Sequence, residues 1–223
     1  MSRYLLVNAS PRAEGTSAVL AKRMAAQLAQ AGHSAACMNL YPHLRRLETV
    51  VEAFADADTL VVFGPCYINT YPADTYALLE AIAQTPDACH GQRVYGFIQG
   101  GMPYAHTHAS GLTALRLFAR ACGLVYGGGF VMGLGAMLNG QPLEKLINAK
   151  AVIRQYDSFC VHVAMGEDSP NEVYEQAQLR LPGFVWRLMA GWMNRRIDRE
   201  AANWGIPKEK VGACFYPIPE AEA

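Results

Sequence analysis

The sequence has no excess of charge of either sign. Its 223 residues include 19 Lys and Arg and 19 Asp and Glu, so the formal net charge is zero. Nucleic-acid-binding domains are typically basic, and proteins that steer partners by charge carry a net charge of one sign, so neither class is expected. Hydrophobic residues make up 52% and charged residues 17%, a composition that excludes a disordered chain.

Closely spaced cysteines are also lacking. The six cysteines include no CxxC pair and no compact run, which argues against an iron–sulfur cluster and favours reduced, mostly buried thiols over a disulfide framework. The first residues offer only four consecutive apolar positions, fewer than the core of a signal peptide needs. Residues 121–143 carry no charge but include seven glycines, so we expect a buried strand leading into a glycine-rich loop, and a cytoplasmic protein.

Two nucleotide-binding motifs are missing. The sequence contains no GxxxxGK[ST], and no GxGxxG follows an expected strand. These absences argue against a Walker-type phosphate loop and against a tightly held dinucleotide.

Short apolar runs alternate with longer amphipathic segments. The runs predict strands at residues 4–8, 34–40, 59–64, 93–99 and 124–132. The intervening patterns predict helices at residues 16–31, 46–57, 72–84 and 107–122, and a further helix that opens near Pro142. This alternation is typical of an α/β fold with a five-stranded parallel sheet and helices on both faces. We expect this domain over residues 1–166 and a C-terminal helical extension over residues 167–223.

The loop at residues 9–17 follows the first strand and runs into a helix. A helix N-terminus with nearby hydroxyl groups binds anions, because its backbone N–H groups and its dipole favour negative charge. Ser10, Thr16 and Ser17 supply hydroxyls, Arg12 supplies a guanidinium and Gly15 permits close approach of the backbone. The sequence therefore predicts a phosphate site, with simple helix capping by Thr16 or Ser17 as the alternative.

Three loops together resemble one known family. The segments SPRAEGTS (10–17), GPCYINTYPADTY (64–76) and QGGMPY (99–104) are similar to the ligand loops of the flavodoxin-like NAD(P)H-dependent FMN reductases and quinone reductases. The resemblance covers residues 4 to about 165 and implies an FMN cofactor, NAD(P)H as co-substrate, a small-molecule electron acceptor and a homodimer. It implies that Ser10, Arg12, Thr16 and Ser17 hold the FMN phosphate, that Pro65, Cys66, Tyr67, Ile68 and Asn69 line the flavin ring, and that Gly100, Gly101 and Tyr104 lie near its polar edge.

The expected activity is an NAD(P)H-dependent oxidoreductase that passes hydride through the flavin to a quinone, azo, nitro or similar acceptor. Tyr104 and His106 are candidate catalytic residues. The pair His106 and His108 supplies only two metal ligands, so no metal is expected; ligand-facing, capping and solvated roles remain open for both. The alternatives to an enzyme are a flavodoxin-type electron carrier and a flavin-free interaction module.

The C-terminal part changes in character. Residues 171–204 predict a helix interrupted at Pro182 and Gly183. One side of this helix carries the apolar residues Trp186, Met189, Trp192 and Met193. The same segment contains four arginines, Arg187, Arg195, Arg196 and Arg199. We expect this helix to pack on the domain or on a partner subunit, where Trp186 or Trp192 would cover a flavin site in trans, rather than to lie on a membrane.

Overall fold

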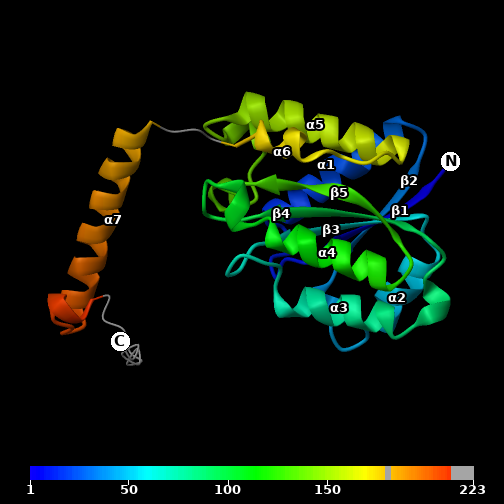
Figure 1. The fold of residues 1–223 in the computed structure, drawn as a ribbon, viewed down its shortest axis with the longest axis horizontal. Coiled ribbons are helices and arrows are strands. Elements are labelled where there is room, and N and C mark those ends of the chain that lie inside the picture. The colour runs from blue at the N-terminus through cyan, green and yellow to red at the C-terminus, as the bar shows by residue number, and fades with distance from the viewer. Residues whose placement is uncertain (179–181, 212–223) are drawn as a thin grey trace, which may run out of the picture. The chain divides into compact units, whose positions relative to one another are not determined.

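A computed structural model of the chain describes residues 1–178 and 182–211 and contains one five-stranded parallel sheet (Figure 1). The strands are β1 (Arg3–Asn8), β2 (Ser34–Asn39), β3 (Thr59–Pro65), β4 (Arg93–Gln99) and β5 (Val125–Met132), in the order β2-β1-β3-β4-β5. Every neighbouring pair is parallel. The predicted α/β sheet is therefore confirmed, and each strand lies where its apolar run placed it.

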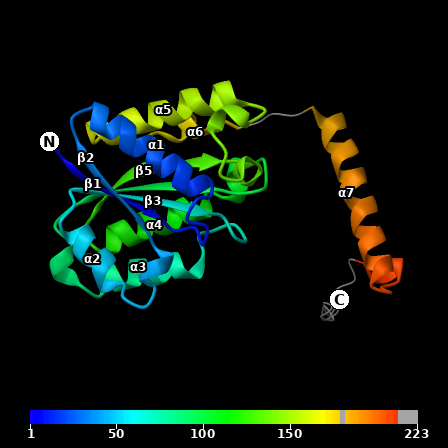
Figure 2. The same ribbon diagram turned by 180° about the vertical axis from the view of Figure 1, so that it is seen from behind.

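Helices cover both faces of the sheet (Figures 1 and 2). One layer contains α1 (Thr16–Gln30), α5 (Ala149–Met165) and the short α6 (Asn171–Glu175); the other contains α2 (Glu48–Ala55), α3 (Ala73–Ala83) and α4 (Ser110–Ala121). Every residue of the central strand β3 is buried, as expected for a parallel strand covered on both sides. The ring of Phe97 in β4 stacks between Phe63 and Phe130 at centroid distances of 5.3 and 5.7 Å, so the core is continuous across the middle of the sheet.

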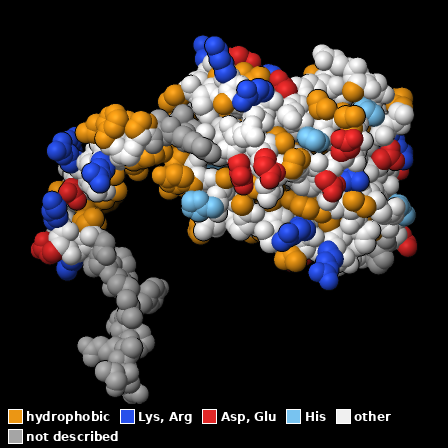
Figure 3. Space-filling model, turned by 45° about the horizontal axis from the view of Figure 1, so that its top comes forward, with side chains coloured by type: hydrophobic (Ala, Val, Ile, Leu, Met, Phe, Trp, Pro, Cys, Tyr) orange, Lys and Arg blue, Asp and Glu red, His pale blue; other side chains and the backbone are white. Residues whose placement is uncertain are grey.

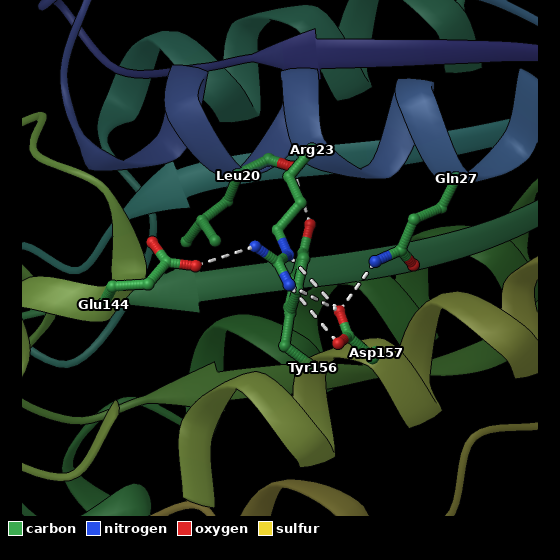
Figure 4. A network of polar contacts seen from close by, with 6 residues as sticks. All are labelled: Leu20, Arg23, Gln27, Glu144, Tyr156 and Asp157. Carbon is green, nitrogen blue, oxygen red and sulfur yellow. Dashed lines mark hydrogen bonds and ion pairs between the residues drawn. The ribbon is translucent and has the colours of Figure 1, made fainter. Parts of the chain in front are cut away.

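Polar contacts fix α1 against α5 (Figure 4). Arg23 of α1 pairs with Asp157 of α5 at 3.2 Å and with Glu144 at 3.4 Å. Gln27 donates to the same Asp157 carboxylate at 2.6 Å, and the Tyr156 hydroxyl donates to a backbone carbonyl of α1 at 2.7 Å. These contacts hold α1 in place, and the N-terminus of α1 forms part of the site described below.

The predicted helix near Pro142 begins later than expected. Residues Leu143–Lys145 form a single 3-10 turn, and α5 starts only at Ala149. Leu146 adopts an extended conformation, with φ −72° and ψ 150°, which ends the turn. The Asn148 side chain donates to the carbonyl of Ala177 at 2.7 Å, so a tertiary contact sets the point where α5 begins.

The chain divides into two compact units, Met1–Leu179 and Arg180–Ala223. Sequence composition placed the end of the first domain at residue 166. In the structure Ser169 donates its N–H to the carbonyl of Gly127 at 2.8 Å, and the Gln178 side chain bonds to the backbone of Gly133 and Val131. Residues 167–178 therefore pack with the sheet.

The second unit contains α7 (Gly183–Asn203) and the 3-10 turn Lys208–Lys210. No residue of α7 is buried, and its exposed apolar side chains include Phe184, Leu188, Met189 and Trp192. Within residues 1–178 and 182–211, no helix combines the length and apolar character needed to cross a membrane. The part of the predicted extension at residues 179–181 and 212–223, including Cys214, lies outside the described residues.

Candidate functional site

A cavity lies at the carboxyl ends of β1, β3 and β4, where the strand order changes direction. In the sheet, β1 lies between β2 on one side and β3 on the other, so the connection after β1 runs in the opposite direction to those after β3 and β4. Open parallel sheets bind ligands at such a switch point. The cavity measures about 180 Å³ and is lined by residues of four loops: Ser10, Arg12, Gly15, Thr16, Pro65, Cys66, Tyr67, Gln99, Gly100, Gly101 and Ala136. The structure therefore brings the three predicted loops together at one place.

The loop between β1 and α1 is held by its own side chains. Asn8 accepts a hydrogen bond from the N–H of Ser10 at 3.1 Å, and the Ser10 hydroxyl accepts one from the N–H of Arg12 at 3.2 Å. The N–H of Gly15 donates to the carbonyl of Arg12 at 3.2 Å. A Cβ on Gly15 would lie 3.1 Å from the Cβ of Arg12, so the loop is tight where it approaches the cavity.

The start of α1 offers unused hydrogen-bonding groups. The first N–H groups of a helix have no partner within the helix, and Gly15, at the N-cap, has no side chain to satisfy them. The Ser17 hydroxyl in the first turn is fully buried, with no hydrogen-bond partner among the described residues. Ser10, Arg12 and Thr16 line the cavity, whereas Ser17 lies behind it and does not. A buried hydroxyl without a partner is unfavourable, and the cavity-lining groups of this loop fit the phosphate of a mononucleotide.

The loop after β5 supports the same site, and sequence analysis did not assign it a role there. Arg12 donates to the side chain of Asn139 at 2.6 Å, and the Thr16 hydroxyl donates to the carbonyl of Gly135 at 3.0 Å. The single proton of the Thr16 hydroxyl is thus used within the protein, so in this arrangement Thr16 can only accept. Leu134 and Asn139 both have positive φ. In the sequence, only the richness of this loop in Gly and Asn could have indicated that it takes part in the site.

The loop after β3 forms a two-residue hairpin. Tyr67 and Thr70 exchange backbone hydrogen bonds of 2.8 and 3.4 Å, and the residues between them, Ile68 and Asn69, have φ of 50° and 70°. Positive φ at both positions defines a type I′ turn, which is strained for β-branched Ile68. Pro65, Cys66 and Tyr67 line the cavity; Ile68, 97% exposed, and Asn69 form the hairpin tip and do not line it.

The loop after β4 approaches the cavity through backbone. A Cβ on Gly100 would lie 2.7 Å from Nε2 of His108 and 3.1 Å from the Cβ of Cys66, whereas a Cβ on Gly101 would meet nothing within 4 Å. Only glycine therefore fits at position 100. The side-chain oxygen of Gln99 is buried, with no partner within the part of the chain that the structure describes.

The two histidines of this loop occupy different environments. The ring of His106 stacks on Tyr104 at 5.6 Å, and neither residue lines the cavity. His108 is only 2% exposed, so a solvated role is wrong for it. The Thr107 hydroxyl lies 2.7 Å from the carbonyl of Tyr104, to which it can donate, and 2.9 Å from Nδ1 of His108. Nε2 of His108 is buried and has no hydrogen-bond partner among the described residues.

The Cys66 thiol is not prepared as a nucleophile. Burial raises its pKa, although a hydrogen bond from the backbone of Asn69 lowers it in part. The thiol donates to the carbonyl of Thr107 at 3.7 Å. Cys66 is thus a neutral wall of the cavity at neutral pH. Across residues 1–178 and 182–211, His, Cys, Asp and Glu side chains form no group of three or more that could hold a metal ion.

A protein-family model described as a flavodoxin-like fold matches residues 2–134. The chain belongs to this flavodoxin-like family. No curated protein matches it. Among solved structures, this flavodoxin-like chain resembles the apo form of an NADH:FMN oxidoreductase, with 21% identity, a TM-score of 0.60 and coverage of 78% of this chain and 94% of that one.

Two further solved structures resemble the flavodoxin-like chain. An FMN-dependent NADH-azoreductase from Bacillus anthracis str. Ames Ancestor, in complex with FMN, has 15% identity and a TM-score of 0.55, with coverage of 73% of this chain and 99% of that one. A mutant flavodoxin from Pseudomonas aeruginosa has 15% identity and a TM-score of 0.54, with coverage of 75% and 99%. At these identities the similarity shows the fold, which both reductases and a flavodoxin share.

Proposed function

We propose that this flavodoxin-like protein binds FMN and is an NAD(P)H-dependent oxidoreductase. The observation that carries the proposal is the cavity at the switch point of the sheet, which Ser10, Arg12 and Thr16 line where the first loop meets α1. The neighbouring Ser17 hydroxyl is buried and has no hydrogen-bond partner among the described residues. The chemistry that FMN supplies when bound is acceptance of a hydride from NAD(P)H and its delivery to a quinone, azo, nitro or similar acceptor.

The first loop would bind the phosphate. Arg12 would supply a charge-assisted hydrogen bond, Ser10 and Ser17 would supply hydroxyls, and the N–H groups at the start of α1 would point at the phosphate oxygens. Thr16 would act by holding the loop after β5 through its bond to Gly135. The Arg12 guanidinium is already oriented by Asn139, which reduces the entropy lost on binding.

The other two loops would position the flavin ring. Pro65, Cys66 and Tyr67 present apolar cover on one side of the cavity, and Gly100 and Gly101 leave backbone groups accessible on another. A flat, mostly apolar ring with polar atoms on one edge requires this division between cover and backbone donors. The neutral thiol of Cys66 adds no charge beside the ring.

Catalytic residues are proposed only at the rim. Tyr104 and His106 stack on each other in the loop that also contains Gly101, and in our proposal they contact the co-substrate or the acceptor. Tyr104 is 46% exposed, which leaves it accessible to a ligand that enters from solvent.

The binding test compares flavins that differ in their phosphate. Titration of the purified chain should show FMN bound at least tenfold more tightly than riboflavin, because riboflavin lacks the group that the first loop would hold. Replacement of Arg12 by Ala should reduce this preference. Equal affinity for the two flavins would contradict the phosphate assignment.

The catalytic test separates an enzyme from the two alternatives. An oxidoreductase should oxidise NADH or NADPH with a free quinone and no protein partner, whereas a flavodoxin-type carrier should need a partner for turnover. A flavin-free interaction module should show no absorbance near ~450 nm after incubation with FMN and removal of the unbound flavin by gel filtration.

We also propose a homodimer formed through α7. Its exposed apolar side chains, together with basic residues on the same helix (Figure 3), have the composition of a subunit interface. Trp192, 64% exposed, is the largest single apolar surface near the middle of the helix and would be central to such an interface.

A further inference from the structure

A second cavity lies at the edge of the sheet formed by β5. It measures about 150 Å³ and is bounded by β5 and by α4 and α6, which both pack against this edge strand (Figure 1). Five side chains with polar groups line it: Thr113, Arg116, Tyr126, Asn171 and Tyr174. None of these residues lines the cavity at the carboxyl ends of β1, β3 and β4, so the two sites are distinct.

The hydroxyl of Tyr174 differs from those of the other buried tyrosines. Tyr174 is only 6% exposed, and its hydroxyl makes no hydrogen bond to any described residue. The four other buried tyrosines each donate to a backbone carbonyl at 2.7–3.1 Å; they are Tyr4, Tyr71, Tyr95 and Tyr156. A buried tyrosine hydroxyl usually finds such a partner, so the Tyr174 hydroxyl is free to bond to a ligand in the cavity.

The remaining polar groups of this cavity are also unused. The hydroxyls of Thr113 and Tyr126, the guanidinium of Arg116 and the amide of Asn171 have no hydrogen bond or ion pair with any residue that the structure describes. Among the described lining residues, Arg116 is the only charged one. A guanidinium matches the two oxygens of a carboxylate, and hydroxyl and amide groups can donate to the lone pairs that are left.

The size and walls of the cavity restrict the rest of the ligand. A cavity of about 150 Å³ holds a molecule of the size of benzene. Leu112 of α4 lines the same cavity and is buried, and the ring of Tyr126 is partly buried against the core. These side chains provide an apolar wall beside the charged group.

We propose that this cavity binds a small organic acid whose carboxylate pairs with Arg116 and whose compact body packs against Leu112 and Tyr126. The Tyr174 hydroxyl donates to the carboxylate. Inorganic phosphate matches the donors but has no body to fill the apolar part, so it binds more weakly. The inference does not depend on the proposed function, because the two cavities share no lining residue.

The ligand would join three elements of the first unit. Its carboxylate would contact α4 through Arg116 and α6 through Tyr174, and its body would contact β5 through Tyr126. Because the cavity exists only in the folded chain, bound ligand should stabilise the fold by mass action.

The test uses benzoate as the probe and the full folded chain. Titration followed by amide chemical shifts in NMR should give a Kd of about 1 mM or lower, with the largest shifts in α4, β5 and α6. Benzyl alcohol has the same ring without the charge and should bind about tenfold more weakly, as should inorganic phosphate. Equal affinity for benzoate and benzyl alcohol, or shifts centred on residues 10–17, would overturn the proposal.

Three variants locate the site. Arg116→Gln should weaken benzoate binding about tenfold, and Tyr174→Phe about three- to tenfold. Tyr174→Phe should leave the thermal unfolding midpoint without benzoate unchanged, because the hydroxyl has no partner within the described chain. Arg120→Gln is the matched control, since Arg120 is exposed in the last turn of α4 and does not line the cavity; its affinity should equal that of the natural sequence. Benzoate affinity of Arg116→Gln within about twofold of the natural value would refute the role of this guanidinium and with it the site.

Discussion

The Ser17 hydroxyl provides a test in which stability and flavin affinity should move in opposite directions. In the protein alone this buried oxygen has no hydrogen-bond partner among the described residues, and such a group costs about 1–3 kcal/mol. Ser17→Ala removes it and leaves the backbone of α1 unchanged. The free energy of unfolding without flavin should therefore stay the same or rise by about 1 kcal/mol.

With FMN present the same substitution should be unfavourable. A hydrogen bond to a charged phosphate contributes about 1.5–3 kcal/mol, so the variant should bind FMN about 10- to 100-fold more weakly. At an FMN concentration 100 times the Kd of the natural sequence, bound flavin should stabilise that sequence by about 2.7 kcal/mol and the variant by only about 0.4–1.4 kcal/mol. Denaturant unfolding with and without FMN, and fluorescence titration, measure both quantities.

Ser169→Ala is the matched control. Its hydroxyl is also buried without a partner within the described residues, but Ser169 lies beside Gly127 and Gly128 in β5 rather than at the N-terminus of α1. This variant should show the same effect on stability without flavin and an unchanged Kd. If Ser17→Ala bound FMN within twofold of the natural affinity, the Ser17 hydroxyl would not contact the phosphate, and the argument from the partnerless hydroxyl would be refuted.

Three further predictions address other parts of the molecule. Gly100→Ala should weaken FMN binding and lower the free energy of unfolding by about 1–3 kcal/mol, because the new Cβ would lie 2.7 Å from a buried histidine nitrogen. Gly101→Ala, whose Cβ would meet nothing within 4 Å, should do neither. Isothermal titration with FMN and denaturant unfolding of both variants measure the two effects. Burial raises the pKa of Tyr95 to about 12, so the unfolded state loses this proton first, near pH 10, and the free energy of unfolding falls between pH 10 and 12. Tyr95→Phe should make that fall less steep by about 1.4 kcal/mol per pH unit. Denaturant unfolding across this pH range measures it, and the same slope in the variant and the natural sequence would contradict the assignment. Trp192→Glu should convert the dimer to monomer in light scattering, whereas Asn194→Glu on the opposite side of α7 should not; a monomeric natural protein would refute the proposed interface.

Local sequence patterns were sufficient to predict the sheet. The all-apolar run of β3 predicts a strand buried on both faces because no polar side chain interrupts it, and the small and hydroxylated residues before α1 predict an anion site because a helix N-terminus has the same unpaired N–H groups in any fold. The helix expected from Pro142 shows the limit of such patterns. Apolar residues recur at helical spacing from Leu143 onward, but α5 begins only at Ala149. The side chain of Asn148, immediately before it, is held by a tertiary contact with Ala177.

The contacts that complete the site join residues that no local pattern connects. Arg12 meets Asn139, 127 positions away, because the loop after β5 returns to the start of α1. His108 has the sequence context of a solvated loop histidine, and its burial follows from the close approach of Gly100. Sequence alone determined which segments form strands and helices, since these depend on nearest neighbours. Only the packed sheet decided which side chains meet, since that depends on strand order.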